Sequence, residues 1–375
     1  MNYDLVIVGA GIVGAACADA AARAGLSVLV VDRGPVGGGA TAAGMGHLVV
    51  MDDSAAQFAL THYSRRLWSE LAPELPPGVE YDPCGTLWVA ADEAEMAEAR
   101  RKERYFSERG VSVEILDAAS LQRAEPNLRG GLAGGLRVLE DAVLYPPSAA
   151  RFLLDRARRH QAEVRTGVEV KTILAEGGVV LADGERIGAG TAVIAAGCGS
   201  PGLVPSLPVR KRKGHLVITD RYPGFVKHQI VELGYLKSAH STSADSVAFN
   251  IQPRKTGQML IGSSRQFGVE HDQVDADLLP RMLRRAFEYL PGLPALSALR
   301  TWAGHRPATP DKLPLIGPSI DSERVWLATG HEGLGITTSL GTGQLLADMI
   351  LQQTTAIPSA PYSPSRLSHL EANHG

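Results

Sequence analysis

The residues Gly9-Ala10-Gly11-Ile12-Val13-Gly14 have the spacing Gly-x-Gly-x-x-Gly, and an acidic residue, Asp32, follows 18 positions after the last glycine. In this pattern the first glycine permits a tight turn, the second lets the backbone approach a pyrophosphate, and the third lets a helix pack closely on a strand. A carboxylate at Asp32 would accept hydrogen bonds from a ribose hydroxyl and repel a 2′-phosphate, which argues against NADP. The pattern therefore predicts that this part of the chain binds a dinucleotide.

These residues must be positioned by two strands and a helix. The apolar run 4–8 predicts a buried parallel strand, and the alanine-rich stretch after the glycines predicts a helix that ends at Gly25. A second strand at 27–31 leads directly to Asp32. The N-terminus of the helix then presents unpaired N–H groups and the positive end of its dipole to phosphates. An ordinary βαβ unit with a glycine-rich turn is the alternative, and the combination of strand, spacing and acid favours the dinucleotide site.

A second glycine-rich segment, residues 37–47, distinguishes FAD from NAD. An NAD dehydrogenase would normally continue after Asp32 into another helix and strand. The segment instead resembles one found in the D-amino acid oxidase, glycine oxidase and sarcosine oxidase family of flavoproteins. There it wraps the pyrophosphate and reaches the isoalloxazine ring, and Thr41 to His47 match its placement. The resemblance implies FAD as the cofactor.

Three later segments resemble the same family. Residues 164–174 resemble a strand pair beside the adenine, with Val168 in backbone contact, and residues 193–197 resemble a strand end close to the cofactor. Residues 325–337 resemble the last FAD segment, a strand, glycine loop and helix whose amides face the flavin C2 carbonyl and stabilise negative charge there. The motifs and the resemblance together imply cofactor contacts at Gly9, Gly11, Ile12, Val13, Gly14, Asp32, Arg33, Thr41, Ala42, Gly44, Met45, Gly46, His47, Val168, Ala196, Gly197, Arg306, Gly330, His331, Gly333, Leu334, Gly335, Ile336 and Thr337.

The three cysteines bear on how the flavin is held. Sarcosine oxidases with a covalently attached flavin resemble this chain but carry a cysteine near the ring, and Cys17, Cys84 and Cys198 do not match that position. Non-covalent FAD is therefore expected. The cysteines also lack the spacing for a thiolate-held metal, and no metal site is expected.

The segment 302–311 resembles the part of the family that carries the substrate-binding arginine, and Arg306 matches that residue. Arginine binds a carboxylate through two parallel hydrogen bonds, which would hold the Cα–H of an amino acid about 3–3.5 Å from flavin N5. A structural arginine paired with an acid such as Asp311 is the alternative.

Other substrate-site assignments depart from the family pattern. Asn250 stands where glycine oxidases have a tyrosine, and Gly333 stands where some relatives have a second arginine. Arg265 would line the pocket where relatives have methionine. His47 would lie near the flavin face, where a polar side chain suggests a hydroxylated or charged substrate; a structural role is the alternative for His47 and for His331. The candidate catalytic residues are thus Arg306, His47, Asn250 and Arg265.

Residues 44–53, 213–216 and 263–267 resemble one branch in particular, the FAD subunits of bacterial hydroxyproline (D-proline type) dehydrogenases. The resemblance implies FAD-dependent dehydrogenation or oxidative deamination of a small amino or imino acid, with D-hydroxyproline or D-proline favoured and hydride passing from Cα to flavin N5. The alternatives are a glycine or sarcosine type of oxidase that uses oxygen, and an electron-relay subunit without a substrate. A pyridine-nucleotide oxidoreductase would need a second Gly-x-Gly-x-x-Gly, which the chain lacks. The sequence leaves three points open. They are the electron acceptor (oxygen, a quinone or a partner redox protein), the stereochemistry of the substrate, and the oligomeric state, which could be homo- or hetero-oligomeric.

The predicted fold class is α/β. A Rossmann-type FAD-binding domain with a parallel sheet is expected from residues 1–78, 141–205 and 307–353, and a substrate domain with a mostly antiparallel sheet from residues 79–140 and 206–306. Strands are expected at 83–90, 215–219, 246–253 and 258–263, and a charged helix at 93–109. The tail, residues 354–375, is rich in proline and serine and is expected to form a surface strap or to be partly mobile.

Composition mainly excludes functions. The 375 residues include 41 glycines, and the net charge of −3 gives no global reason to bind nucleic acid. The cysteine content fits a reducing cytoplasm, no signal peptide or apolar span is evident, and peripheral contact with the inner membrane stays open. The basic run Arg210-Lys211-Arg212-Lys213 is expected to be a solvated edge leading into a turn at 213–215; a localisation signal and a docking site for an acidic partner are the alternatives.

Overall fold

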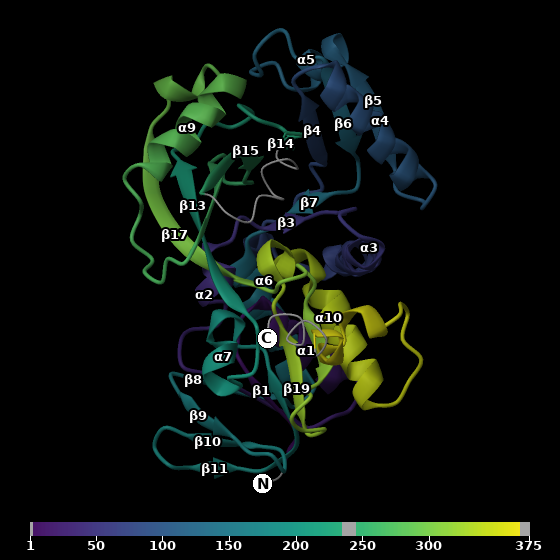
Figure 1. Ribbon diagram of the computed structural model, residues 1–375, viewed down its shortest axis with the longest axis vertical. Helices are drawn as coiled ribbons and strands as arrows, with labels where there is room; N and C mark the ends of the chain where they lie inside the picture. The colour runs from purple at the N-terminus through teal and green to yellow at the C-terminus, as the bar shows by residue number, and fades with distance from the viewer. Residues whose placement is uncertain (1–2, 235–244, 368–375) are drawn as a thin grey trace, which may run out of the picture.

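The computed structural model describes residues 3–234 and 245–367. Two large sheets lie at opposite ends of the longest dimension of the molecule, with helices between and around them (Figure 1). The sequence analysis predicted one sheet of parallel strands and one that is mostly antiparallel, and both are present.

Within residues 3–234 and 245–367 the first sheet has six strands, and it contains the N-terminal βαβ unit. Every neighbouring pair in it is parallel except the edge pair β18–β19. In spatial order its strands are β18 (Leu315–Pro318), β19 (Val325–Thr329), β12 (Ala189–Ile194), β1 (Tyr3–Val8), β2 (Val28–Asp32) and β8 (Glu163–Thr166).

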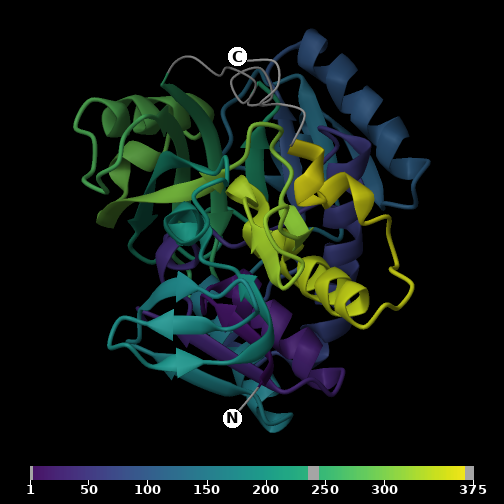
Figure 2. The same ribbon diagram turned by 60° about the horizontal axis from the view of Figure 1, so that its bottom comes forward.

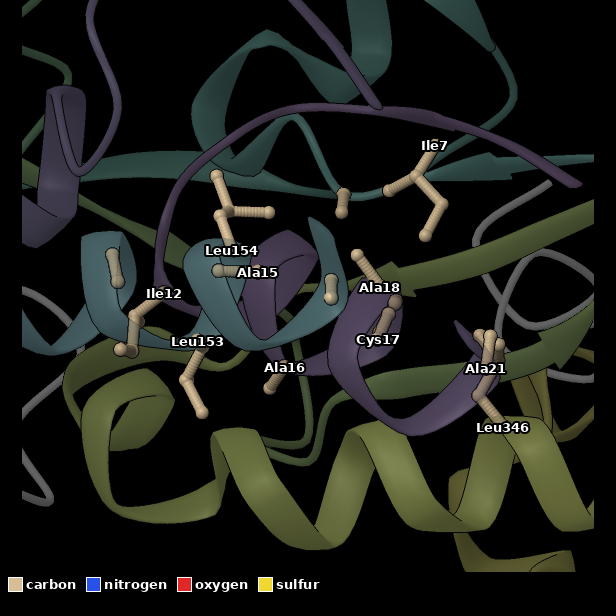
Figure 3. Packing of buried hydrophobic residues seen from close by; sticks show 14 of the residues in the cluster. Ile7, Ile12, Ala15, Ala16, Cys17, Ala18, Ala21, Leu153, Leu154 and Leu346 are labelled. Atoms are coloured by element: carbon tan, nitrogen blue, oxygen red, sulfur yellow. The ribbon is translucent and has the colours of Figure 1, made fainter. Parts of the chain in front are cut away.

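In the described part of the chain, one face of this sheet is covered by α1 (Ile12–Arg23), α6 (Pro146–Arg159) and α10 (Gly335–Ile350). Helix α3 (Ala55–Leu71) packs against α10. The alanines of α1 let α6 and α10 approach it closely, as Figure 3 shows for Ala15, Ala16 and Ala21 against Leu153, Leu154 and Leu346. The other face of β1 packs against a three-stranded sheet of β9 (Val170–Ile173), β10 (Val179–Leu181) and β11 (Arg186–Ile187), which lies beside it in Figure 2. Because β1 is buried on both faces, its residues form a continuous apolar run.

The strand pair predicted at 164–174 needs a correction. Two strands are present there, but β8 pairs with β2 in the large sheet and β9 pairs with β10 in the small one. Gly167 between them has a φ of 72°, and the chain changes sheet at this point.

Among the described residues, the second sheet has eight strands. Of the pairs formed by these strands, only β14–β4 is parallel. In spatial order the strands are β17 (Ala298–Ala308), β13 (Arg210–Thr219), β16 (Met259–Phe267), β15 (Ser246–Pro253), β14 (Gln229–Glu232), β4 (Thr86–Ala90), β6 (Gly134–Val138) and β5 (Val113–Asp117). Helix α9 (Leu278–Tyr289) packs its buried residues against β15 and β16, and α4 (Glu93–Ser107) and α5 (Ala118–Ala124) pack against β4, β5 and β6. The boundaries of the two domains stay a prediction.

Short elements connect the two sheets. They are α2 (Gly39–Ala43), the paired strands β3 (His47–Leu48) and β7 (Ala142–Val143), and α7 (Ser200–Leu203). The tail up to residue 367 crosses the surface as two 3₁₀ turns, and its buried Tyr362 donates a hydrogen bond from its hydroxyl to the carbonyl of Ala56 (2.6 Å). The predicted strap therefore holds for residues 354–367, and residues 368–375 lie outside the described part.

The basic run 210–213 is not a solvated edge, and no turn follows it. It begins β13, a strand between β16 and β17, and Arg212 and Lys213 are buried. Arg212 forms an ion pair with Glu332 and lies 4.9 Å from the centre of the Phe267 ring. The prediction was wrong because β17, which covers one side of β13, lies about ninety residues further along the chain.

Candidate active site

A cavity of about 570 Å³ lies where the two sheets meet. It is lined by the loop after β1, by α2, by the chain after β12, by β13 and β17, and by the loop before α10. The sequence-predicted residues that line it are Gly9, Gly11, Ile12, Val13, Asp32, Arg33, Thr41, Gly44, Met45, Gly46, His47, Ala196, Gly197, Asn250, Arg306, His331, Gly333, Gly335 and Ile336. The predicted residues that do not line it are Gly14, Ala42, Val168, Arg265, Gly330, Leu334 and Thr337.

The three glycines of the Gly-x-Gly-x-x-Gly motif have different structural roles. Gly9 has a φ of 119°, and a β-carbon there would overlap the carbonyl of Ala195, which directly follows the neighbouring strand β12. A β-carbon at Gly14 would overlap the carbonyl oxygen of Gly9, so Gly14 allows the helix to pack and makes no lining contact. Gly11 is different, because a β-carbon there would meet only the hydroxyl of Thr41, at 3.2 Å. The bare backbone of Gly11 at the start of α1 fits a pyrophosphate group of a dinucleotide.

Asp32 shapes this loop from the end of β2. One carboxylate oxygen accepts a hydrogen bond from the N–H of Ala10 (2.6 Å) and the other from the N–H of Gly34 (2.7 Å). A carboxylate has about four acceptor positions, so Asp32 keeps capacity for a ribose hydroxyl. The hydroxyl of Thr41 accepts from the N–H of Ile12 (3.0 Å), which ties α2 to the first turn of α1.

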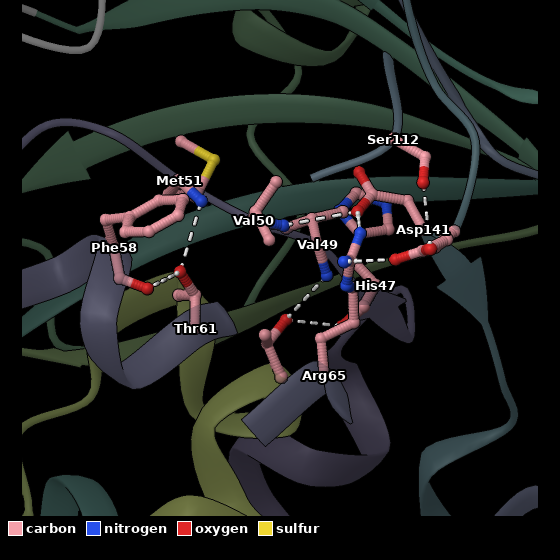
Figure 4. A network of polar contacts seen from close by, with 11 residues as sticks. His47, Val49, Val50, Met51, Phe58, Thr61, Arg65, Ser112 and Asp141 are labelled. Atoms are coloured by element: carbon pink, nitrogen blue, oxygen red, sulfur yellow. Dashed lines mark hydrogen bonds and ion pairs between the residues drawn. The ribbon is translucent and has the colours of Figure 1, made fainter. Parts of the chain in front are cut away.

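A polar network fixes the segment that carries His47 (Figure 4). The hydroxyl of Thr337 donates to the carbonyl of His47 (2.7 Å), and the N–H of Val50 donates to Asp141 (3.3 Å). Burial raises the pKa of Asp141 to about 6, while Arg65 at 3.3 Å opposes that shift. Thr337 was predicted to touch the cofactor; its hydroxyl instead holds the backbone of a residue that lines the cavity.

His47 presents a neutral imidazole to the cavity. Burial and, to a smaller extent, the Arg306 guanidinium lower its pKa to about 4, and the polar contact with Gln252 has a smaller opposing effect. Its buried Nε2 has no hydrogen-bond partner among residues 3–234 and 245–367.

Arg306 lies on β17, opposite Arg212 of β13. Its guanidinium passes over Gly214, where a β-carbon would overlap it, and donates to the carbonyl of Ser264 (3.2 Å). Gly333 leaves room on another side, since a β-carbon there would lie 3.6 Å from Cδ of Arg306. The acid named as an alternative partner, Asp311, forms its ion pair with Arg366 (2.7 Å).

Asn250 and Arg265 have different surroundings. The side-chain amide of Asn250 lines the cavity, and its Nδ2 lies 3.5 Å from the hydroxyl of Ser263. Arg265 is buried in β16 and does not line the cavity, so the prediction that it faces the pocket is corrected. The register of β16 shifts in this region, where Ser246 lies opposite Arg265 and Asn250 opposite Gly262, and a strand pattern alone does not reveal such an irregularity.

Several lining residues were not predicted as site residues, among them Cys198, Lys211, Asp272, Gly304 and His305. Gly304 and His305 lie directly before Arg306 on β17, so the position of Arg306 could have indicated them. Lys211 could not be indicated in this way, because it reaches the cavity through the pairing of β13 with distant strands. Asp272 lies in the loop between β16 and α9.

His331 also lines the cavity, but its side chain contacts helix α10. It is buried, and its Nε2 lies 3.0 Å from the hydroxyl of Thr342 on α10. Burial lowers its pKa to about 3. This geometry fits the structural alternative.

The low pKa of His331 predicts acid sensitivity. Between its ordinary pKa of 6.5 and about 3, the unfolded chain binds a proton at this residue and the folded chain does not. Stability is therefore lost as the pH falls through this window, and by pH 5 the loss from His331 is about 2 kcal/mol. Urea unfolding at pH 7.5 and pH 5 should show a smaller loss for His331→Gln, because glutamine can keep a contact with Thr342 without titrating. Asp141 changes the free energy of unfolding in the opposite direction, but equally in the wild type and the variant, so its effect cancels in the comparison. An equal loss of stability in both proteins would contradict the prediction.

The parallel sheet, the glycine loop at a helix N-terminus and the cavity shared with a second sheet define a dinucleotide-dependent oxidoreductase. The chain belongs to the DAO family of FAD-dependent oxidoreductases, whose family model matches residues 4–349. FAD is thus the cofactor, as predicted, and the cradle around Gly11, Asp32 and Thr41 fits it.

The chain is similar to named proteins over nearly all its length. It is 30% identical over 387 residues to the glycine oxidase of Pseudomonas aeruginosa, covering 97% of this chain and 99% of the relative. The crystal structure of glycine oxidase from Geobacillus kaustophilus is 28% identical with a TM-score of 0.86, and 97% of this chain and 99% of that chain are covered. L-proline dehydrogenase from P. horikoshii shares the fold, with a TM-score of 0.89 at 22% identity and 98% of each chain covered. No helix in the described part of this chain is long and apolar enough to cross a membrane.

Non-covalent attachment predicts that acid precipitation releases free FAD into the supernatant. Among the cysteines, Cys198 alone lines the cavity, in the described part of the chain, and burial raises the pKa of its thiol to about 11, which disfavours the nucleophilic thiolate. The absorbance of the supernatant and of the pellet measures the outcome. A yellow pellet after unfolding would contradict it.

Proposed function

We propose that this enzyme oxidises a small amino or imino acid, with D-hydroxyproline or D-proline as the favoured substrate and Arg306 holding its carboxylate. The observation that carries the proposal is the position of the Arg306 guanidinium, which lines the same cavity as the dinucleotide-binding loop. The similarity to glycine oxidases over the whole chain supports an amino acid substrate.

The chain needs little acid–base machinery for this reaction. When bound, FAD supplies the acceptor, flavin N5, for the hydride that leaves the substrate Cα. Arg306 supplies orientation through two parallel hydrogen bonds to the carboxylate. The neutral His47 beside Arg306 leaves the positive charge of the guanidinium as the attraction for that carboxylate.

Two features favour an imino acid of the hydroxyproline type over glycine or sarcosine. Asn250 lines the cavity where glycine oxidases resembling this chain have a tyrosine, and the segments 44–53 and 263–267 resemble the hydroxyproline branch. The glycine or sarcosine type of oxidase is the second candidate, favoured by the names of the relatives. An electron-relay subunit without a substrate is the third.

An anaerobic screen of amino and imino acids tests the proposal. Bleaching of the flavin band by a hydroxyproline or proline is the expected result, whereas bleaching by glycine or sarcosine alone would favour the second candidate. If no amino or imino acid bleaches the flavin, the proposal fails and the relay subunit is favoured. Readmission of air then distinguishes the possible electron acceptors. Fast return of the flavin colour identifies an oxidase, and slow return of the colour indicates that a quinone or a partner redox protein is the acceptor.

The setting of the enzyme is also part of the proposal. We propose a cytoplasmic enzyme, supported by its three free cysteines, Cys17, Cys84 and Cys198. Assembly with itself or with a redox partner follows from the branch resemblance, and the mass of the native protein measures it.

A further inference from the structure

Two buried polar atoms of cavity-lining residues lack a hydrogen-bond partner in the described part of the chain. Oδ1 of Asn250 and Nε2 of His47 both lack a hydrogen-bond partner among residues 3–234 and 245–367, and both residues line the cavity. Leaving such atoms unsatisfied costs free energy in a folded protein, so a group that enters the cavity is expected to pair with them.

The two atoms belong to one corner of the cavity. Asn250 and Gln252 lie on the same face of β15, and Gln252 donates to the carbonyl of Met45 (2.8 Å) while its side chain lies beside His47. A β-carbon at Gly262, opposite Asn250, would lie 2.9 Å from Oδ1 of Asn250 and 3.3 Å from the sulfur of Met45. The absence of a side chain at Gly262 therefore lets Asn250, Met45 and Leu216 pack closely here.

The corner is offset from the carboxylate site. The Arg306 guanidinium contacts the carbonyl of Ser264, whereas Asn250 lies opposite Gly262, two residues back along β16. The amino group of an amino acid stands on the carbon next to its carboxylate and stays close to Arg306. A substituent on the far side of a five-membered ring lies further from the carboxylate than the amino group does.

The corner favours a neutral ligand group. The acceptor oxygen of Asn250 repels a second carboxylate, and the nearby Arg306 disfavours an ammonium group. Met45 and Leu216 supply the apolar remainder of its wall. A hydroxyl fits best, because it can donate to Oδ1 of Asn250 and share its other hydrogen-bonding capacity with Nε2 of His47.

We infer that Asn250 and His47 form a subsite that reads a hydroxyl on the substrate ring, so that the enzyme selects a hydroxylated imino acid over its deoxy counterpart. The inference rests on the proposed function. Asn250 determines specificity in this scheme, and Arg306 remains the carboxylate ligand for both compounds.

Paired substrates test the inference. In the holoenzyme, kcat/KM is measured for proline and for both C4 epimers of 4-hydroxyproline at each Cα configuration. The wild-type enzyme should prefer one hydroxylated epimer over the matched proline by at least about tenfold, since a site built to bond a hydroxyl rejects the analogue that lacks it. Asn250→Leu, which keeps the size of the side chain, should reduce that preference by about tenfold or more. Asn127→Leu, the same exchange at an exposed position, should leave the preference within about twofold.

The remaining outcomes of these measurements each overturn the inference. An equal loss for both compounds in Asn250→Leu overturns the inference and assigns Asn250 to the amine or to packing. A wild-type enzyme that shows no preference for a hydroxylated epimer also overturns it, and this readout does not depend on the variant folding. If glycine or another amino acid reduces the flavin but neither imino acid does, the subsite is wrong while oxidation of an amino acid stands. If no amino or imino acid reduces it, the proposed function fails as well.

Discussion

Replacing Arg306 with alanine is expected to lower kcat/KM for the substrate by about 10³-fold, because removing one partner of a desolvated charge pair costs about 4 kcal/mol. The guanidinium is held over Gly214 and by the carbonyl of Ser264, so the arginine is already aligned before substrate arrives. Arg306→Lys keeps the charge but loses the forked geometry, and we expect a loss of about 10–100-fold. Anaerobic flavin reduction, measured by stopped flow over a range of substrate concentrations, gives both values.

Arg300→Ala provides the matched control. Arg300 is exposed on the same strand, β17, and lies 5.5 Å from the Trp302 ring, away from the cavity. Its substitution should change kcat/KM by less than about twofold. The carboxylate assignment would be wrong if Arg306→Ala reduced the flavin at the wild-type rate, or if both variants lost activity alike.

The two neighbouring motif glycines should give opposite phenotypes. Gly14→Ala places a methyl group on the carbonyl oxygen of Gly9, and we expect a loss of at least about 2–3 kcal/mol in the free energy of unfolding. Gly11→Ala meets only the hydroxyl of Thr41 at 3.2 Å, so the protein should fold with nearly its normal stability. The new methyl group stands where a pyrophosphate would approach the backbone, and FAD should bind at least about tenfold more weakly, or about 1.4 kcal/mol.

Urea unfolding of the apoproteins and titration with FAD separate the two effects. Gly11→Ala should unfold near the wild-type urea midpoint and show a raised dissociation constant for FAD, whereas Gly14→Ala should unfold at much lower urea. Normal FAD affinity in Gly11→Ala would place the pyrophosphate elsewhere.

Local sequence patterns predicted much of this molecule because the features involved are short-range. The strand–glycine–helix unit around Gly11 and the final strand, loop and helix at 325–350 each form within a few dozen residues, and both are present. Arg306 was found through the motif around it, and it lines the cavity. The motif itself did not indicate Gly214, a residue from a strand about ninety positions earlier that makes room for its side chain.

Features set by distant pairing were missed. Lys213 was expected where a solvated edge leads into a turn, and it is fully buried because β16 and β17 pair with the two sides of its strand. Thr337 was expected at the cofactor and instead holds the backbone of His47, 290 residues away in the chain. In each case a distant segment determines the burial or the hydrogen bond of the side chain. A single sequence does not specify which distant segments meet.

The hydrogen bonds between Asp32 and the backbone of the neighbouring loop have a kinetic consequence. Its two carboxylate oxygens already hold the N–H groups of Ala10 and Gly34, on either side of the turn that receives the dinucleotide. A preorganised receptor has little conformational entropy left to lose when its ligand arrives. Association of FAD with the apoprotein should therefore proceed in one concentration-dependent phase, without a slow step in which the loop folds around the bound nucleotide.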